Sequence, residues 1–207
     1  SCFTSIDGSH AGQAAAQYAA GIELEPLSQD AVKAKTECLL APMAMENGFN
    51  ANWARDVLHS IMAPYWVSTA KTEATLKAAL VQVEYMRDYV IPNLAACNSH
   101  DLRLCIEMQH KVRSAEMKLR AGLARKESRG NHFRSDIPYR DDENYLCYII
   151  VKKQSDGSMA TEKVSIPENW AGDTTMPYDQ RYRYYFPGEP EAKGFTPPAP
   201  RRRGMGG

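Results

Sequence analysis

Apolar side chains recur at spacings of three and four residues through the middle of the chain, which is the pattern of helices that bury one face. The first of two long stripes begins near Thr72 and ends before Pro92. Its apolar positions are Leu76, Leu80, Val83, Met86 and Val90. The second stripe opens at Ser99, and its inner side holds Leu102, Cys105, Ile106, Met108, Val112, Ala115, Leu119 and Leu123. A short connection joins the two, so they are expected to form antiparallel helices.

Two shorter helices are predicted ahead of these long ones. Ser28 can cap a helix that stops at Pro42. A linker over residues 43–51 then leads to a second helix, which ends at Pro64. Together with the long helices, they predict a mainly α fold in which residues from about Ser28 to 128 form an antiparallel helical bundle.

Charged pairs lie on the opposite side of the longest helix. Glu107 precedes Lys111 by four residues, and Glu116 precedes Arg120 by the same spacing. An acid placed four residues before a base favours an ion pair on a helix surface. Both pairs are therefore expected to be solvated and to have no functional role.

The hydrophobic period changes after residue 144. Residues 145–152 (YLCYIIVK), a turn at Asp156 and Gly157, and residues 159–166 predict a β-hairpin. Residues 167–200 form an irregular extension that is rich in aromatic residues and proline, and it is expected to wrap over a partner domain or subunit. The final PPAPRRRGMGG is predicted to be a disordered basic tail.

Charge and hydropathy argue against several kinds of partner. The 207 residues carry 25 basic and 25 acidic side chains, so the formal charge is zero and neither nucleic acid nor a membrane surface is indicated. No stretch approaches the ~18 apolar residues of a membrane span. The first residues also lack the basic segment and apolar run of a signal peptide, so a cytoplasmic setting is expected.

Cysteines and histidines show no metal-binding pattern. The cysteines at positions 2, 38, 97, 105 and 147 have no CxxC spacing, so reduced and mostly buried thiols are expected, which cannot hold an iron–sulfur cluster by themselves. The isolated histidines lack both the HExxH spacing and a carboxylate partner, so no metal site is predicted. These are His10, His59, His100 and His110.

Residues 125–143 (RKESRGNHFRSDIPYRDDE) form a dense charged stretch directly after the longest helix. Gly130 is expected to end that helix, and Pro138 forces extended backbone before it. The basic groups Arg129, His132, Arg134 and Arg140 then face the acidic groups Asp136, Asp141, Asp142 and Glu143. They can pair with one another in a turn that clamps the helix to a neighbouring domain, or they can meet an anionic partner.

This stretch resembles a family signature. Residues 127–130 (ESRG), His132, Arg134, Asp136, Pro138 and residues 140–144 (RDDEN) are similar to the ESRGxHxRxDxPxRDDEN motif of the flavoprotein subunits of succinate dehydrogenase and fumarate reductase. L-Aspartate oxidase carries a shorter version, and the adenylylsulfate reductase flavoprotein carries a divergent one. The resemblance is specific for the superfamily and leaves the substrate open.

The resemblance implies a domain organisation. Residues 1–26 would be the last helix of an FAD-binding domain, and 27–143 a helical bundle domain that ends in the charged signature. Residues 144–166 would be the hairpin, and 167–207 the extension with its tail. The sequence has no GxGxxG motif, which the family carries upstream with its substrate arginines. The chain is therefore expected to be a C-terminal portion of a larger enzyme, inactive alone and binding FAD weakly if at all.

The resemblance also implies cofactor, site residues and partners. The loop at residues 1–6 would pass the flavin ring, because a helix N-terminus stabilises the negative charge of reduced flavin. The implied FAD-contacting residues are Thr4, Ser5, Ile6 and Gly8. The bundle would dock on the FAD-binding portion and on an iron–sulfur electron-transfer subunit through Glu127, Arg129, His132, Arg134, Asp136, Arg140 and Asp141. The location would then be cytoplasmic, or peripheral to a membrane through a partner subunit; no catalytic residue is assigned.

Two classes of function compete on this sequence. One is a part of an FAD-dependent oxidoreductase, and the other is a non-catalytic helical interaction module that docks through its aromatic extension. The glycine-containing helix of residues 1–22 favours the first, since a simple bundle has no need of it. Within the first class, the signature favours fumarate or succinate chemistry, whereas the opening SCFTSIDG and the hairpin also resemble adenylylsulfate reductase.

Overall fold

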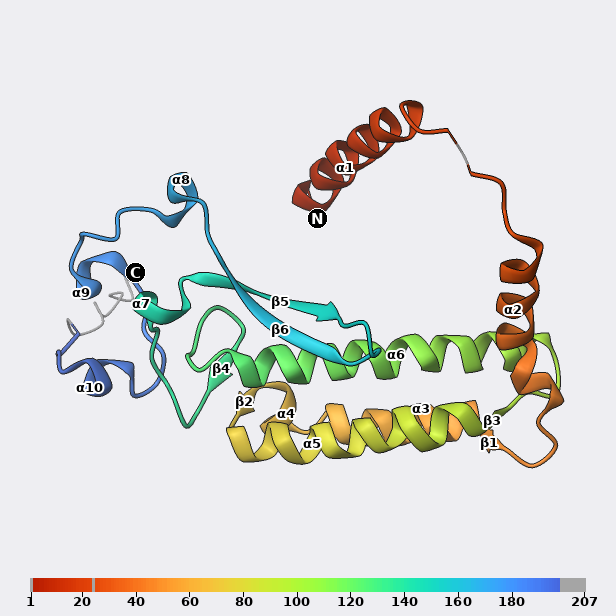
Figure 1. Ribbon diagram of the computed structural model, residues 1–207. Coiled ribbons are helices and arrows are strands. Elements are labelled where there is room, and N and C mark those ends of the chain that lie inside the picture. Colours follow the sequence, from red (N-terminus) through yellow and green to blue (C-terminus); the bar gives the residue numbers. More distant parts are fainter. Residues whose placement is uncertain (1, 24, 198–207) are drawn as a thin grey trace, which may run out of the picture. The chain divides into compact units, whose positions relative to one another are not determined.

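The computed structural model describes residues 2–23 and 25–197, and it divides the chain into two units between Leu40 and Ala41 (Figure 1). The first unit contains α1 (Cys2–Ala20) and α2 (Gln29–Leu40). Ser28 Oγ accepts a hydrogen bond from the backbone N–H of Ala31 at 3.3 Å, so the predicted start of α2 is confirmed. The loop expected over residues 1–6 is wrong, because α1 is already helical from Cys2 and this segment has no proline to prevent it.

Helices α3 (Ala51–Met62), α5 (Glu73–Tyr85) and α6 (Ser99–Ala124) build the bundle of the second unit. In Figure 1, α3 and α5 lie along α6. Each helix begins at a polar cap: Asn50, Thr72 and Asn98 accept hydrogen bonds from backbone N–H groups of the first turn. The predicted helical bundle is therefore confirmed for α3, α5 and α6, whereas α2, which the sequence analysis included in it, belongs to the first unit and buries none of its side chains.

The core of this unit is formed by the apolar stripes that the sequence predicts. Val83 and Cys105 are completely buried, and Met86, Met108, Val112 and Leu119 are almost so. Partly buried side chains pack around this core, among them Leu80, Leu102 and Leu123. Residues of α5 and α6 at spacings of three and four thus meet across one interface, which is the source of the bundle's hydrophobic stabilisation.

Short elements connect the bundle helices. They are η1 (Ala41–Ala44), α4 (Tyr65–Ser68), the π-helical turn η2 (Met86–Val90) and η3 (Ile91–Asn93). Two-residue parallel pairings join β1 (Phe49–Asn50) to β3 (Leu94–Ala95) and β2 (Ala70–Lys71) to β4 (Phe133–Arg134). The second pairing brings the charged stretch against the entry to α5.

The end of α6 differs from the expectation. The helix stops at Ala124, and Arg125 is already extended with φ −87° and ψ 102°. Its guanidinium donates hydrogen bonds to the carbonyls of Tyr145 at 2.9 Å and Cys147 at 2.6 Å. These long-range contacts end the helix early. Gly130, with φ +56°, instead forms the turn of a short bridge between Arg129 and His132.

The pair of Glu116 and Arg120 was expected to be solvated, and this expectation is wrong for Glu116. Its side chain is fully buried, and Oε1 accepts hydrogen bonds from Arg120 Nε at 2.8 Å and Arg87 Nη1 at 2.5 Å. The helical spacing alone places Glu116 beside Arg120, but η2 brings Arg87 over it from the neighbouring helix. The pair at Glu107 and Lys111 is partly exposed, as expected.

The predicted hairpin is confirmed, and the extension after it gains short helices. Strands β5 (Cys147–Lys153) and β6 (Met159–Ser165) pair antiparallel, with Cys147 opposite Ser165 and Lys153 opposite Met159. The short helices on either side of the hairpin are α7 (Asp142–Tyr145), α8 (Glu168–Ala171), α9 (Tyr178–Arg181) and α10 (Glu189–Lys193). The basic tail that the sequence predicts lies, from residue 198 on, outside the described residues.

Two further observations concern thiols and hydropathy. Cys38 and Cys97 are exposed, so the expectation of mostly buried thiols is wrong for these two, whereas Cys105 is buried. Within the described ranges, none of the helices combines the length and apolar character that a membrane span needs.

Gly48→Ala should destabilise the second unit. A Cβ at Gly48 would lie 2.5 Å from the carbonyl oxygen of Asn93 and 2.8 Å from Cβ of Ala95. The backbone would have to shift, at a cost of roughly 1–3 kcal/mol. Gly122→Ala is the matched control, because its new methyl would be 3.6 Å from His132 and alanine favours the helix interior by up to ~1 kcal/mol. Urea unfolding followed by circular dichroism measures both, and equal stability of the two variants would contradict the close approach at Gly48.

Candidate functional site

Glu127 is the centre of the charged stretch. Its side chain is fully buried, and Oε1 accepts hydrogen bonds from Arg125 Nη1 at 2.5 Å and Arg129 Nε at 2.7 Å. Oε2 accepts from Arg129 Nη2 and from the backbone N–H of Asp141, both at 2.8 Å. Two guanidinium groups thus compensate one buried carboxylate, which is the arrangement that a buried charge requires. We call Glu127, Arg125, Arg129, Asp141 and Asp142 the Glu127 cluster.

Arg129 extends this cluster to the C-terminal extension. Its Nη2 lies 2.5 Å from Oδ1 of Asp142, and its Nη1 donates to the hydroxyl of Tyr182 at 3.2 Å. Arg181 forms a second ion pair with Asp142. Burial opposes the charge of Arg129, but the hydrogen bonds to Glu127 and Asp142 outweigh it and raise the pKa of the guanidinium. For Asp142, burial is likewise outweighed by the bonds from Arg129 and Tyr182, and the pKa of the carboxyl is lowered.

Arg134 and Asp136 form a separate bidentate pair. Arg134 is 1% exposed, and its Nε and Nη2 each lie 2.7 Å from an oxygen of Asp136. Asp136 Oδ2 also accepts from the backbone N–H of Glu73 at 2.9 Å, in the first turn of α5. The Arg134 guanidinium, together with this backbone hydrogen bond, lowers the pKa of the Asp136 carboxyl. This pair therefore ties the charged stretch to the start of α5.

Arg140 pairs with Glu189, a residue of α10. Arg140 Nη1 lies 3.0 Å from Oε2 of the fully buried Glu189, and its guanidinium stacks 4.1 Å from the centre of the Tyr182 ring. The hydroxyl of Tyr178 also bonds to Glu189. Burial and this carboxylate raise the pKa of Tyr178. The aromatic extension thus folds onto the charged stretch of its own chain.

His132 lies apart from these ion pairs. Its Nε2 is 3.3 Å from the carbonyl oxygen of Arg125. Burial, helped by the nearby cations Lys71, Arg134 and Arg125, lowers the pKa of the imidazole to about 4. The ring is therefore neutral at pH 7, and it is not an ion-pair partner of the acidic residues.

The predicted site residues fall into groups. Glu127, Arg129 and Asp141 meet in one cluster, whereas Arg134 with Asp136 and Arg140 with Glu189 form two more. The sequence analysis missed the residues of the extension that complete them: Tyr178, Arg181, Tyr182 and Glu189. Their only signal was the density of aromatic and charged residues in that segment.

The implied FAD-contacting residues belong to the other unit. Thr4, Ser5, Ile6 and Gly8 lie in the first two turns of α1. The first turn carries no acidic side chain, which suits a negatively charged group at the helix start. Their contact with FAD stays a prediction. In the described ranges, no three residues among His, Cys, Asp and Glu gather in a way that could hold a metal ion.

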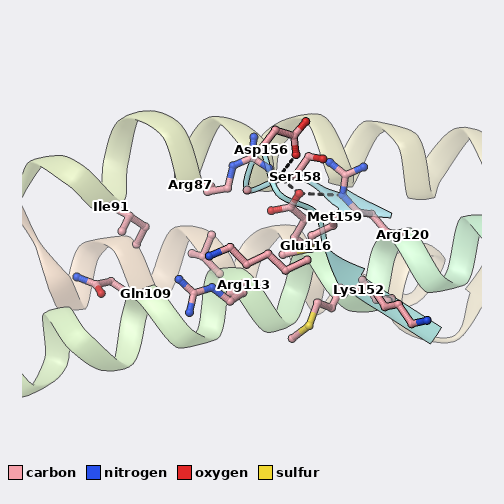
Figure 2. Close-up of a pocket in the computed structure, with 15 residues that line it drawn as sticks. Arg87, Ile91, Gln109, Arg113, Glu116, Arg120, Lys152, Asp156, Ser158 and Met159 are labelled. Atoms are coloured by element: carbon pink, nitrogen blue, oxygen red, sulfur yellow. Dashed lines mark hydrogen bonds and ion pairs between the residues drawn. The ribbon is translucent and has the colours of Figure 1, made fainter. Parts of the chain in front are cut away.

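A cavity of about 790 Å³ separates α6 from the tip of the hairpin. Figure 2 shows Glu116 in this cavity, held by Arg87 and Arg120. Further basic side chains line it from α6 and from β5, namely Arg113, Lys152 and Lys153. Since Glu84, Asp88, Glu116 and Glu162 pair with the cations nearest to them, most charge here is compensated within the chain.

The bundle, hairpin and extension have a known fold. The chain is similar to one chain of the Mycobacterium smegmatis Sdh1 complex in the apo form, with a TM-score of 0.67 and 24% identity over 88% of this chain and 32% of that one. It is also similar to a chain of a quinol-fumarate reductase with menaquinol molecules, with a TM-score of 0.66 and 23% identity over 81% and 29% of the two chains. At these identities the likeness establishes the fold alone.

The sequence establishes the family. Residues 55–182 match the family model described as fumarate reductase flavoprotein C-term, so the chain belongs to this family of flavoprotein C-terminal domains. The matched range includes the whole charged signature and the hairpin.

Individual relatives agree with this assignment. The chain is 29% identical to the fumarate reductase flavoprotein subunit of Mycobacterium tuberculosis over 74% of its own length and 28% of the relative's. It is 28% identical to that of Haemophilus influenzae, over 73% and 27% of the two lengths. An uncharacterized FAD-dependent oxidoreductase of Methanocaldococcus jannaschii is also 28% identical, over 72% and 27%. The chain therefore spans less than a third of the curated relatives it matches.

Glu127→Gln should be strongly destabilising. The amide keeps the shape of the side chain but leaves Arg125 and Arg129 without their shared countercharge, which typically costs ~3–5 kcal/mol. Glu107→Gln is the matched control: Glu107 also pairs with two cations, Arg103 and Lys111, but on a surface where such pairs contribute less than ~1 kcal/mol. Chemical unfolding of both variants measures the difference, and a loss at Glu127 no larger than at Glu107 would contradict the central role of the buried carboxylate.

His132 should make stability depend on pH between about 6.5 and 4. The unfolded chain binds a proton at an ordinary imidazole pKa of ~6.5, whereas the folded ring does so only near pH 4. Stability is then lost as the pH falls through this window, by roughly 1–2 kcal/mol after allowance for partial exposure of the ring. The carboxyl pKa values of Asp136 and Asp142 are also lowered, and these two groups change the stability only at pH values below this window.

Unfolding at a series of pH values tests this. His132→Gln should flatten the slope between pH 6.5 and 4, and His110→Gln, at an exposed position of α6, should retain it. An unchanged slope in the His132 variant would assign the pH dependence to other groups.

Proposed function

We propose that this chain is the C-terminal part of an FAD-dependent oxidoreductase of the fumarate reductase and succinate dehydrogenase type. The observation that carries the proposal is the family match over residues 55–182, which contains the full signature. The names of the curated relatives support fumarate reduction as the reaction of the whole protein. The adenylylsulfate reductase alternative rests on the opening segment and the hairpin, and it stays untested.

The residues of this chain would contribute position and electrostatics. Bound FAD supplies the hydride transfer. The first turn of α1 offers backbone N–H groups and no acidic side chain, so it fits an anionic edge of the cofactor. This segment would hold one side of the flavin, whereas the dinucleotide-binding loop that must hold the phosphates has no match in the sequence.

The Glu127 cluster would prepare the docking surface. Because its arginines are satisfied by carboxylates of the same chain, it acts first by holding α6, the hairpin and the extension in one orientation. The resulting surface would dock on the FAD-binding portion and on an electron-transfer subunit that carries iron–sulfur clusters. A peripheral membrane location would then follow from the partner subunits.

Arg129→Ala should impair both folding and flavin binding. In the 207-residue chain it should lower Tm by several degrees, because Glu127 and Asp142 lose a shared partner. In the complete protein it should lower Tm and the amount of flavin retained after purification together. Arg103→Ala, at an exposed position of α6, is the control and should change neither quantity.

Two results would contradict the docking role proposed for the Glu127 cluster. Full flavin retention with an unchanged Tm, combined with loss of fumarate reduction, would place Arg129 in the active site. A lower Tm of the 207-residue chain with full flavin retention in the complete protein would limit the cluster to the interior of this domain.

A further inference from the structure

A second cavity, of about 510 Å³, lies between α6, strand β5 and the turn that precedes α5. The basic groups that line it are Lys71, Lys118, Arg125 and His132. No aspartate or glutamate is among its lining residues within the described part of the chain. The rest of the wall is largely apolar and includes Leu76 and Ile150. We call it the Lys71 pocket.

Lys71 is buried without a countercharge. Its side chain belongs to a residue that is only 5% exposed, and Nζ donates one hydrogen bond, at 3.1 Å, to the carbonyl oxygen of Thr69. No carboxylate of the described residues lies within ion-pair distance of it, whereas Arg129, Arg134 and Arg140 each lie within 3.0 Å of one. An unpaired buried ammonium is costly, so Lys71 differs from these three arginines.

Among the basic groups that line the pocket, Lys118 adds a second positive charge close to Lys71. Burial and the charge of Lys118 lower the pKa of Lys71. Arg125 is already committed to Glu127 and to two backbone carbonyls. His132 is neutral at pH 7 because of its own burial. Two ammonium groups, one deep and one at the exposed face of α6, are therefore left to share an anion in this pocket.

We propose that the Lys71 pocket binds an organic carboxylate with a small apolar body. The carboxylate would lie between the ammonium groups of Lys71 and Lys118, and the body would pack on Leu76 and Ile150. A carboxylate fits better than a phosphate, because no guanidinium remains free for bidentate contacts and most of the wall is apolar. This site goes beyond the proposed function, which it neither requires nor explains.

Binding should be measurable through stability. A ligand that contacts both α6 and the hairpin binds the folded state and not the unfolded one. The Tm therefore rises as the ligand concentration rises. The probe is benzoate, titrated into the 207-residue chain at constant ionic strength, and the neutral isostere benzamide is the matched control. We expect a saturable rise of Tm with benzoate and none with benzamide. Isothermal calorimetry gives Kd independently.

Variants test the two ammonium groups. Lys71→Met keeps the apolar stem and removes an unpaired buried charge, so it should fold and should weaken benzoate binding at least tenfold. Lys118→Met, at the exposed side, should weaken benzoate binding several-fold. It tests the proposal even if the Lys71→Met variant does not fold. Lys77→Met, on the surface of α5 beside Glu73, should leave the Kd unchanged.

Several outcomes would overturn the proposal. They are equal binding of benzamide, a benzoate Kd that Lys71→Met and Lys118→Met leave unchanged, and tighter binding of inorganic phosphate than of benzoate. Loss of benzoate binding in the complete protein would also do so, since it would show that a carboxylate of the protein itself takes this place.

Discussion

The buried carboxylate of Glu127 is the constraint on which the arrangement of the second unit depends. Its neighbours in sequence, Arg125 and Arg129, supply the countercharges, and the backbone N–H of Asp141 comes from a turn farther on. Arg129 also donates to Tyr182 of the extension. A buried ion pair adds little net stability compared with apolar packing, but loss of one partner is very costly. The cluster therefore selects one orientation of hairpin and extension on the bundle more than it strengthens the fold.

A second buried carboxylate repeats this arrangement earlier in the chain, within α6. Glu116 is held by Arg87 from η2 and by Arg120 from its own helix, and Arg120 also reaches Glu84. Two arginines surround each carboxylate, and the second positive charge is balanced by further acidic side chains. These are Asp88 and Glu84 at Glu116, and Asp142 at Glu127. A formal charge of zero over the whole chain thus conceals a local separation, in which the arginines around Glu116 and Glu127 are paired and Lys71 is not.

The signature that marks the family has a physical explanation in this arrangement. The spacing of two between Arg134 and Asp136 allows a bidentate pair, and Asp136 also reaches the N-terminal turn of α5. The spacing between Glu127 and Asp141 closes a loop around Ser128, whose hydroxyl bonds to the carbonyls of Arg134 and Ile137. The motif is therefore a compact folded loop in which Arg129, Arg134 and Arg140 each pair with a carboxylate of the same chain, while Nη1 of Arg134 is buried without a hydrogen-bond partner.

The sequence alone was sufficient for the elements that depend on local patterns. Apolar spacing located α3, α5 and α6, caps and prolines located most of their ends, and alternation located the hairpin, because backbone geometry and one-sided burial act over a few residues. The sequence alone could not predict contacts between residues that are distant along the chain. Arg125 ends α6 before Gly130 because it binds carbonyls of residues 145 and 147, and Glu116 is buried because η2 carries Arg87 over it. The partners of Arg129 and Arg140 in the extension follow no sequence period, so only the folded chain brings them together.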